Sequence, residues 1–193
     1  QTGMILKITE CVFEKAFAQL VEWKNKGFDD LKISINLSPK LLDEKLIDQI
    51  KHYMEVYKLT GSDFELEITE TAIVEDVEKT FHILNELRKL HIRIALDDFG
   101  TGYSSLSYIK RFDIDRLKIA KELIDNIDDD KNTLLIVKAI IMMAKGMGLK
   151  TIAEGVEAEN QLELLKFLEC DEVQGYIYGR PIPPDEFEAM HLD

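Results

Sequence analysis

The sequence predicts an α/β protein of the TIM type, a (β/α)8 barrel that is incomplete here, with about six of the eight strands present. Three observations predict this fold class. Short strand patterns alternate with helix patterns along the chain, and each strand has one apolar face and one small or polar face. The chain also has only 193 residues, whereas a full barrel has about 250.

The expected elements alternate along the chain, and each strand has a helix before or after it. A helix is expected at 10–26, because apolar residues such as Phe13, Phe17 and Leu20 recur at helical spacing. The residues before it are expected to form a loop. A strand is expected at 31–37, where LKISINL alternates with a period of two. The remaining strands are expected at 64–69, 92–97, 115–119, 150–154 and 172–176, and the remaining helices at 43–57, 76–90, 131–147 and 158–168.

The strand faces decide between two parallel-sheet folds. A doubly wound sheet is covered by helices on both faces, so its strands should be apolar throughout. In FELEIT at 64–69, however, Leu66 and Ile68 share one face while Glu67 lies on the other. A barrel explains this better, because its interior opens onto a site at the C-terminal ends of the strands.

Six strands are two fewer than a complete barrel has. The simplest expectation is that the first two strands are missing and that residues 1–193 form a single, partial domain. An open parallel edge invites pairing with another chain. We therefore expect a dimer or a higher assembly, or an edge that a rearranged terminus covers.

The composition restricts the classes of partner. The chain has 24 Lys and Arg against 37 Asp and Glu, a net charge of −13, so binding to a nucleic-acid polymer or to an anionic membrane is not expected. No apolar run reaches the roughly 20 residues of a spanning helix, and no signal peptide opens the chain. Cys11 and Cys170 lack any metal-site or disulfide-framework spacing. These features predict a cytoplasmic domain, carried by a parent protein that is itself soluble or membrane-anchored.

Polar side chains gather at the ends of the expected strands. Any single one of them is more often a helix cap or a solvated group than a ligand, and Asp128, Asp129 and Asp130 are expected to be of that kind. Carboxylates that converge need cations, and oxygen ligands suit Mg²⁺ or Mn²⁺. A two-metal site for displacement at phosphorus is therefore expected. The whole set comprises Asn36, Glu67, Glu70, Asp97, Asp98, Lys118, Glu154, Glu157 and Gln174.

The segments that carry this set resemble one family. The chain resembles the EAL domain, the bacterial module that hydrolyses cyclic di-GMP to linear pGpG, and the resemblance covers essentially the whole chain. Without it, proton abstraction of the enolase type with Lys118 as base would be the next chemistry to consider. The resembling segments are INLS at 35–38, ELEITE at 65–70, ALDDFGTGYSSL at 95–106, LKIA at 117–120, AEGVE at 153–157 and QGYIYGRP at 174–181.

The resemblance assigns the metal site by position. Asn36, Glu67 and Asp97 match metal ligands, and Asp98 and Glu154 match groups that serve a second metal and its water. The implied cofactors are two ions of Mg²⁺ or Mn²⁺.

The resemblance also assigns the remaining residues. Lys118 matches the lysine that positions the attacking water, which makes Lys118 and Glu154 the expected catalytic residues. Glu70 matches the glutamate that anchors the loop after the paired aspartates. Glu157 and Gln174 match residues that line the metal and guanine-nucleotide site. The implied partners are cyclic di-GMP, a second copy in a homodimer near the DDFGTG loop, and upstream sensory or GGDEF-type domains.

Two departures from the family pattern lead to a second hypothesis about function. The E-x-L motif, with a metal ligand and an arginine that contacts phosphate, is absent, so this piece alone is expected to be impaired. Ala120 stands where the family usually has Asp. The second hypothesis is therefore a degenerate domain that acts as a cyclic di-GMP sensor or protein-interaction module without hydrolysis.

Overall fold

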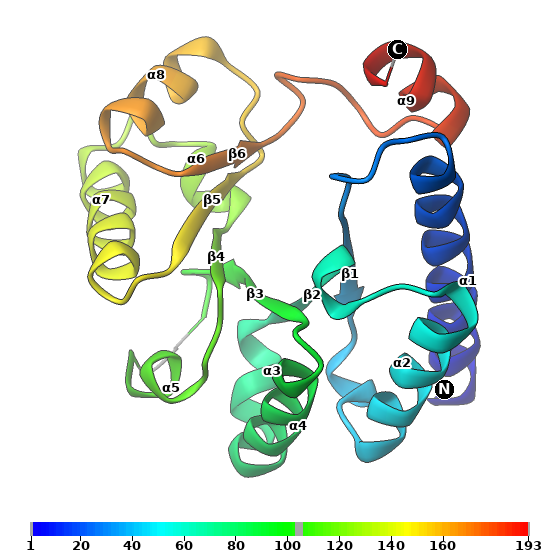
Figure 1. Cartoon of the computed structure of the whole chain (residues 1–193). Coiled ribbons are helices and arrows are strands. Elements are labelled where there is room, and N and C mark those ends of the chain that lie inside the picture. The colour runs from blue at the N-terminus through cyan, green and yellow to red at the C-terminus, as the bar shows by residue number, and fades with distance from the viewer. Residues whose placement is uncertain (1, 103–105, 193) are drawn as a thin grey trace. The chain divides into compact units, whose positions relative to one another are not determined.

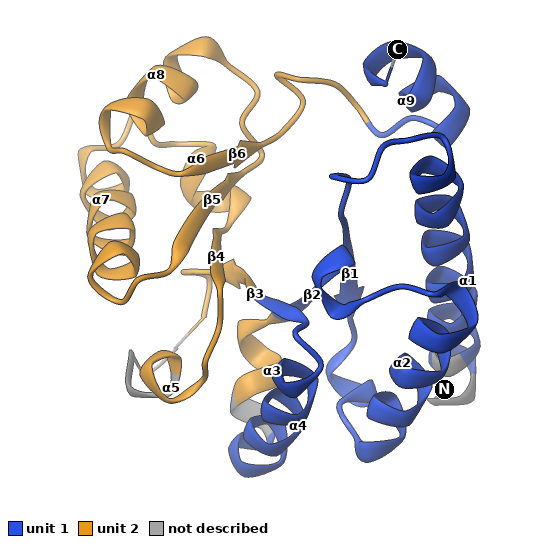
Figure 2. Cartoon of the chain, viewed as in Figure 1, with its two compact units in different colours: residues 1–68, 75–94, 181–193 blue, residues 69–74, 95–180 orange. Residues whose placement is uncertain are grey.

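The computed structural model describes residues 2–102 and 106–192, which form two compact units (Figure 2). Unit 1 comprises residues 1–68, 75–94 and 181–193, and unit 2 comprises residues 69–74 and 95–180. The six strands are hydrogen-bonded in chain order, from β1 to β6. Every pairing whose register is described is parallel. The expected class, successive βα units of the TIM type with six strands, is confirmed.

Unit 1 is built around the parallel pair β1 and β2. The aromatic rings of Phe13 and Phe17 are stacked 5.5 Å apart, and Phe64 meets Phe17 at 4.8 Å. All three side chains are fully buried, so the helical stripe expected in the first helix faces this sheet. The elements are α1 (Thr2–Asn25), β1 (Ile33–Leu37), α2 (Glu44–Tyr57), β2 (Phe64–Thr69), α4 (Val77–Lys89) and α9 (Pro184–His191), with short 3₁₀ turns at Pro39–Leu41 and Gly61–Asp63.

The chain opens in a helix, so the expected loop before residue 10 is wrong. Helix α1 begins at Thr2. Met4, Ile8 and Val12 continue the four-residue spacing of a helix, yet all three side chains are exposed. A sequence search for a buried stripe therefore stops short of the true beginning of this helix.

Unit 2 carries the other strands and their helices. Helix α7 packs on β4 and β5, with Val137, Ile141 and Ala144 buried, and α7 and α8 flank the strands (Figure 1). Asp130 caps α7 by accepting hydrogen bonds from the Asn132 and Thr133 N–H groups, as a helix cap should. The elements are α3 (Glu70–Glu75), β3 (Arg93–Phe99), α5 (Leu106–Arg111), β4 (Arg116–Ile119), α6 (Lys121–Ile124), α7 (Lys131–Gly146), β5 (Lys150–Glu154), α8 (Glu159–Phe167) and β6 (Glu172–Gln174). Helix α3 and strand β3 each have residues in both units.

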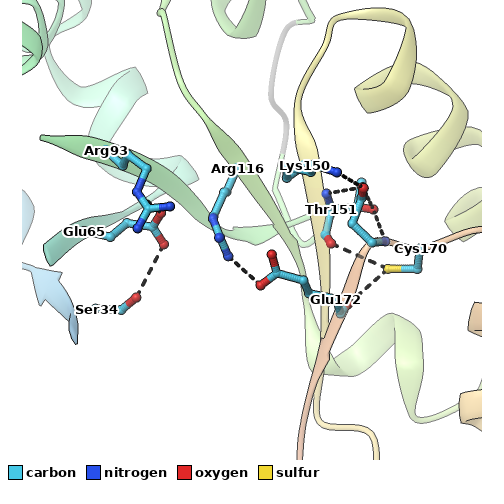
Figure 3. A network of polar contacts seen from close by, with 9 residues as sticks. Ser34, Glu65, Arg93, Arg116, Lys150, Thr151, Cys170 and Glu172 are labelled. Atoms are coloured by element: carbon cyan, nitrogen blue, oxygen red, sulfur yellow. Dashed lines mark hydrogen bonds and ion pairs between the residues drawn. The ribbon is translucent and has the colours of Figure 1, made fainter. Parts of the chain in front are cut away.

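The polar face of β2 lies within the protein, whereas Ser34 and Asn36 on the edge strand β1 are exposed. In unit 1, Glu65 is 3% exposed. Its carboxylate accepts a hydrogen bond from Ser34 Oγ at 3.4 Å and lies 3.9 Å from Arg93 Nε (Figure 3). A buried carboxylate needs such partners. The alternation expected from the sequence therefore reflects a polar interior at β2 and a solvated face at β1.

A second polar cluster joins the start of β6 to β5 in unit 2. The buried Thr151 donates both its N–H and its Oγ1 hydrogen to Asp171 Oδ2, each at 3.0 Å. Lys150 Nζ lies 2.6 Å from Asp171 Oδ1, and Cys170 Sγ lies against the Thr151 and Glu172 carbonyls (Figure 3). Partial burial opposes ionisation of Asp171, but the hydrogen bonds from Lys150 and Thr151 outweigh it and hold the pKa of Asp171 below its ordinary value.

We expect Asp171→Asn to lower the free energy of unfolding by about 1–2 kcal/mol at pH 7. A carboxyl whose folded pKa is depressed stabilises the protein above its unfolded pKa, near 3.8, and loses this effect as pH falls through the folded value. The difference between wild type and variant should therefore shrink below about pH 4. Urea unfolding at several pH values measures it, with Asp48→Asn on the exposed face of α2 as control. A difference that is independent of pH would contradict the assignment.

None of the helices in the described part of the chain is long and apolar enough to cross a membrane.

Candidate active site

A β-bulge in β3 places two adjacent carboxylates on one side of the strand. Leu96 pairs with Leu117 and Phe99 with Ile119, so Asp97 and Asp98 together oppose the single residue between them on β4. Asp98 adopts the left-handed conformation, with φ of 54°, which aspartate tolerates better than most residues. In a regular strand these neighbours would point to opposite faces. The bulge therefore creates the paired carboxylates, as bulges near active sites commonly do.

The carboxylates converge with Glu154, which ends β5. Ligand atoms of Asp97, Asp98 and Glu154 all lie within 4.8 Å of one another. Lys118 on β4 is 3% exposed, and its Nζ lies 3.0 Å from Asp97 Oδ1 and 2.6 Å from Glu154 Oε1. Three of the strands of unit 2 thus deliver one ammonium group and three carboxylates to one point.

The electrostatics of this cluster favour a bound cation. Two carboxylates whose oxygens lie within 4.8 Å of each other repel by at least roughly 3 kcal/mol at an effective dielectric of 20. Loss of hydration, and then the negative charges of Asp97 and Glu122, raise the pKa of Asp98 above its ordinary value, while Lys118 opposes this. Carboxylate oxygens at this spacing are the donors that Mg²⁺ and Mn²⁺ prefer, so the donor set fits such an ion.

An open hollow of about 200 Å³ adjoins Glu154. Two loops form it, and their main chains are joined through Val156, whose N–H donates to the Gln174 carbonyl and whose carbonyl accepts from the Ile177 N–H. A Cβ on Gly175 would lie 2.1 Å from the Val156 oxygen, so only glycine permits this approach. The lining residues are Lys121, Glu154, Gly155, Glu157, Gln174, Gly175 and Tyr176.

Glu70 contacts the loop that follows the bulge. Its side chain is buried, and its Oε2 accepts a hydrogen bond from the Gly100 N–H at 3.3 Å. A Cβ on Gly102 would lie 2.5 Å from Glu70 Oε1, so the loop passes close over this carboxylate. Glu70 is expected to contact residues 100–105 of this loop, of which 103–105 lie outside the described residues.

Asn36 and Glu67 belong to unit 1, where they are neighbours in register on β1 and β2. Glu67 is 6% exposed. Of the predicted site residues, unit 2 brings together Asp97, Asp98 and Glu154 with Lys118, and places Glu157 and Gln174 in the adjoining hollow. The roles assigned to these residues, and those of Asn36 and Glu67 as ligands, stay predictions.

Sequence reasoning missed two features of this site. One is the bulge, which strand alternation cannot reveal. The other is Lys121, whose ammonium lies 2.8 Å from Glu157 Oε1 at the rim of the hollow. The only sequence signal for it was its position directly after LKIA.

Comparisons with known proteins identify the family of the chain and relatives of the same fold. The model of the EAL domain family matches residues 1–181. The signaling protein YkoW of Bacillus subtilis is 42% identical over 100% of the chain, which covers 24% of that protein. The solved structure of the PaMucR phosphodiesterase with c-di-GMP superimposes with a TM-score of 0.92 at 37% identity, covering 96% of this chain and 76% of that one.

A second solved structure contains a metal. It is Klebsiella pneumoniae BlrP1 with manganese and cy-diGMP, with a TM-score of 0.78 at 27% identity over 86% of this chain and 43% of that one. The chain spans about a quarter of the length of the curated relatives that it matches. Since the family model matches nearly the whole sequence, the chain belongs to the EAL domain family.

Proposed function

We propose that the EAL domain of the parent protein, to which these residues belong, hydrolyses cyclic di-GMP to linear pGpG with Mg²⁺ or Mn²⁺. The observation that carries the proposal is the convergence of Asp97, Asp98 and Glu154 around Lys118. The name of a relative supports it, because NbdA of Pseudomonas aeruginosa, 37% identical over 94% of this chain and matched over 23% of its own length, is a cyclic di-GMP phosphodiesterase.

The carboxylates of the cluster would hold the divalent cations, which supply activation of water and charge neutralisation at phosphorus. Lys118 is held by Asp97 and Glu154, so its ammonium is oriented before substrate arrives and can donate to the attacking water or to a phosphate oxygen. Asn36 and Glu67 are proposed as further ligands on the resemblance alone.

The proposal extends to the surroundings of the cluster. Glu70 would fix the loop after β3, and Glu157 and Gln174 would contact the nucleotide. The two units would act together as one EAL domain in the cytoplasm, as a homodimer, with sensory or GGDEF-type domains elsewhere in the parent protein.

Ala120 supports a second candidate function. It is fully buried at the end of β4, and its N–H donates to the Phe99 carbonyl at 3.2 Å. The family that the chain resembles usually has Asp at this position, so this chain lacks one negative charge two residues from Lys118. Weaker metal binding would leave a domain that binds cyclic di-GMP and signals without hydrolysis.

Incubation of cyclic di-GMP with the parent protein and Mg²⁺ or Mn²⁺, followed by chromatography for pGpG, tests the proposal. Hydrolysis that EDTA abolishes would support the enzyme. Binding of the nucleotide without turnover would favour the sensor, and Ala120→Asp should then restore pGpG release. Absence of both binding and turnover would overturn the two candidates together.

A further inference from the structure

The hollow beside Glu154 is lined mostly by acidic and neutral groups. Glu154 and Glu157 carry negative charge, while Gln174 and Tyr176 are neutral. Among the described residues that line it, Lys121 alone carries positive charge. A nucleotide phosphate that enters a site of this kind, in a chain of net charge −13, needs a compensating cation.

Lys121 is held in place at both ends of its side chain. The stem lies against Gly155, which has φ of 71°, and a Cβ on Gly155 would approach Lys121 Cγ to 2.4 Å. The ammonium bonds Glu157 Oε1 at 2.8 Å and Asp125 Oδ1 at 2.9 Å. A side chain held in this way loses little further conformational freedom when it binds a ligand.

The ammonium still has capacity for a ligand. A lysine ammonium has three N–H donors, and the contacts with Glu157 and Asp125 use two. The side chain is 48% exposed, so the third donor is accessible. The hydrogen bonds to Glu157, and then to Asp125, raise the pKa of Lys121 well above its ordinary value, so the group is charged at physiological pH.

We propose that Lys121 is a substrate-binding residue whose ammonium contacts an anionic phosphate oxygen of the nucleotide seated in this hollow. The inference rests on the proposed function and deepens it, since it names a group that recognises the anionic part of the substrate. Lys118 has a different role, because it is buried between carboxylates, whereas Lys121 stands at the open rim.

A purely structural role for Lys121 makes a different prediction. If the ammonium only held Glu157 in place, Lys121→Gln would have no further effect on nucleotide binding once Glu157 is replaced by glutamine. If the ammonium binds phosphate, Lys121→Gln should weaken binding in the Glu157→Gln background as well, whatever Glu157→Gln does on its own.

The experiment measures binding of cyclic di-GMP by titration calorimetry in Ca²⁺, so that the readout does not depend on turnover. The variants are Lys121→Gln, Lys121→Arg, Glu157→Gln and the double variant that combines Lys121→Gln with Glu157→Gln. The matched control is Lys145→Gln on α7, which changes the net charge by the same amount as Lys121→Gln. It removes an exposed lysine whose ammonium lies 2.5 Å from a Glu169 carboxylate oxygen. Binding of Mn²⁺ alone is measured for each variant.

Lys121→Gln should weaken cyclic di-GMP binding roughly 10-fold to 100-fold, the effect of losing one hydrogen bond to a charged group. Mn²⁺ affinity and the Lys145→Gln variant should be nearly unchanged, and Lys121→Arg should recover much of the loss. Equal affinities for Lys121→Gln and Lys145→Gln would overturn the inference and leave the proposed function standing. No further loss from Lys121→Gln in the Glu157→Gln background would also overturn it, and absence of wild-type binding would overturn both.

Discussion

Glu154→Gln is expected to reduce pGpG release at least about 100-fold and to weaken Mn²⁺ binding. The change keeps the size of the side chain but removes one of the three carboxylates that converge within 4.8 Å. It also removes a charged partner of Lys118 Nζ at 2.6 Å. Misplacement of reacting groups by about 1 Å can itself cost on the order of 100-fold in rate.

The matched control is Glu163→Gln, at an exposed position of α8 with the same change of charge. Turnover is followed as pGpG release, and metal binding by titration with Mn²⁺. Full activity in Glu154→Gln would remove this carboxylate from the proposed machinery. Loss of activity in both variants would point to a general effect of charge and not to this site.

The second large effect is expected for Lys118→Met, which removes a buried ammonium from between Asp97 and Glu154. Removal of one partner from a buried ion pair leaves uncompensated charge and costs about 3–5 kcal/mol. We therefore expect a large loss of stability in EDTA, together with loss of hydrolysis. A divalent cation would offset the same carboxylates, so Mn²⁺ should restore much of the stability but not the hydrolysis.

Thermal unfolding with and without Mn²⁺ measures this effect, and Lys138→Met on the exposed face of α7 serves as control. A melting temperature for Lys118→Met that responds to Mn²⁺ no more than wild type does would contradict the assignment of the cluster as a cation site. Retained hydrolysis would show that Lys118 does not orient the reacting groups.

The order and type of the longer elements could be predicted from the sequence, because their patterns are long enough to show a period. The helix at Glu44–Tyr57 and the strand at Phe64–Thr69 lie within a residue of their expected bounds. Helices α3, α5, α6 and α9 were not predicted, because each has eight residues or fewer. Two turns of helix or less contain too few apolar positions to reveal a stripe.

The candidate site could be predicted as a set of residue types but not as a geometry. Strand alternation placed Asp97 with the polar face of β3, and the position of Asp98 beside it depends on the bulge and on a φ of 54°. The contact between Lys121 and Glu157 joins residues 36 positions apart. Such a contact follows from the packing of loops, which local sequence patterns do not encode.

The bulge in β3 also has a consequence for insertions and deletions. It amounts to one additional residue between two registered pairs, Leu96 with Leu117 and Phe99 with Ile119. Deletion of one aspartate would give an uninterrupted strand with its hydrophobic partners still aligned, whereas deletion of Leu96 would also remove the additional residue but would place Asp97 opposite Leu117. The strand can therefore lose one residue at Asp97 or Asp98 and keep its hydrophobic register, although the loss would remove one of the paired carboxylates.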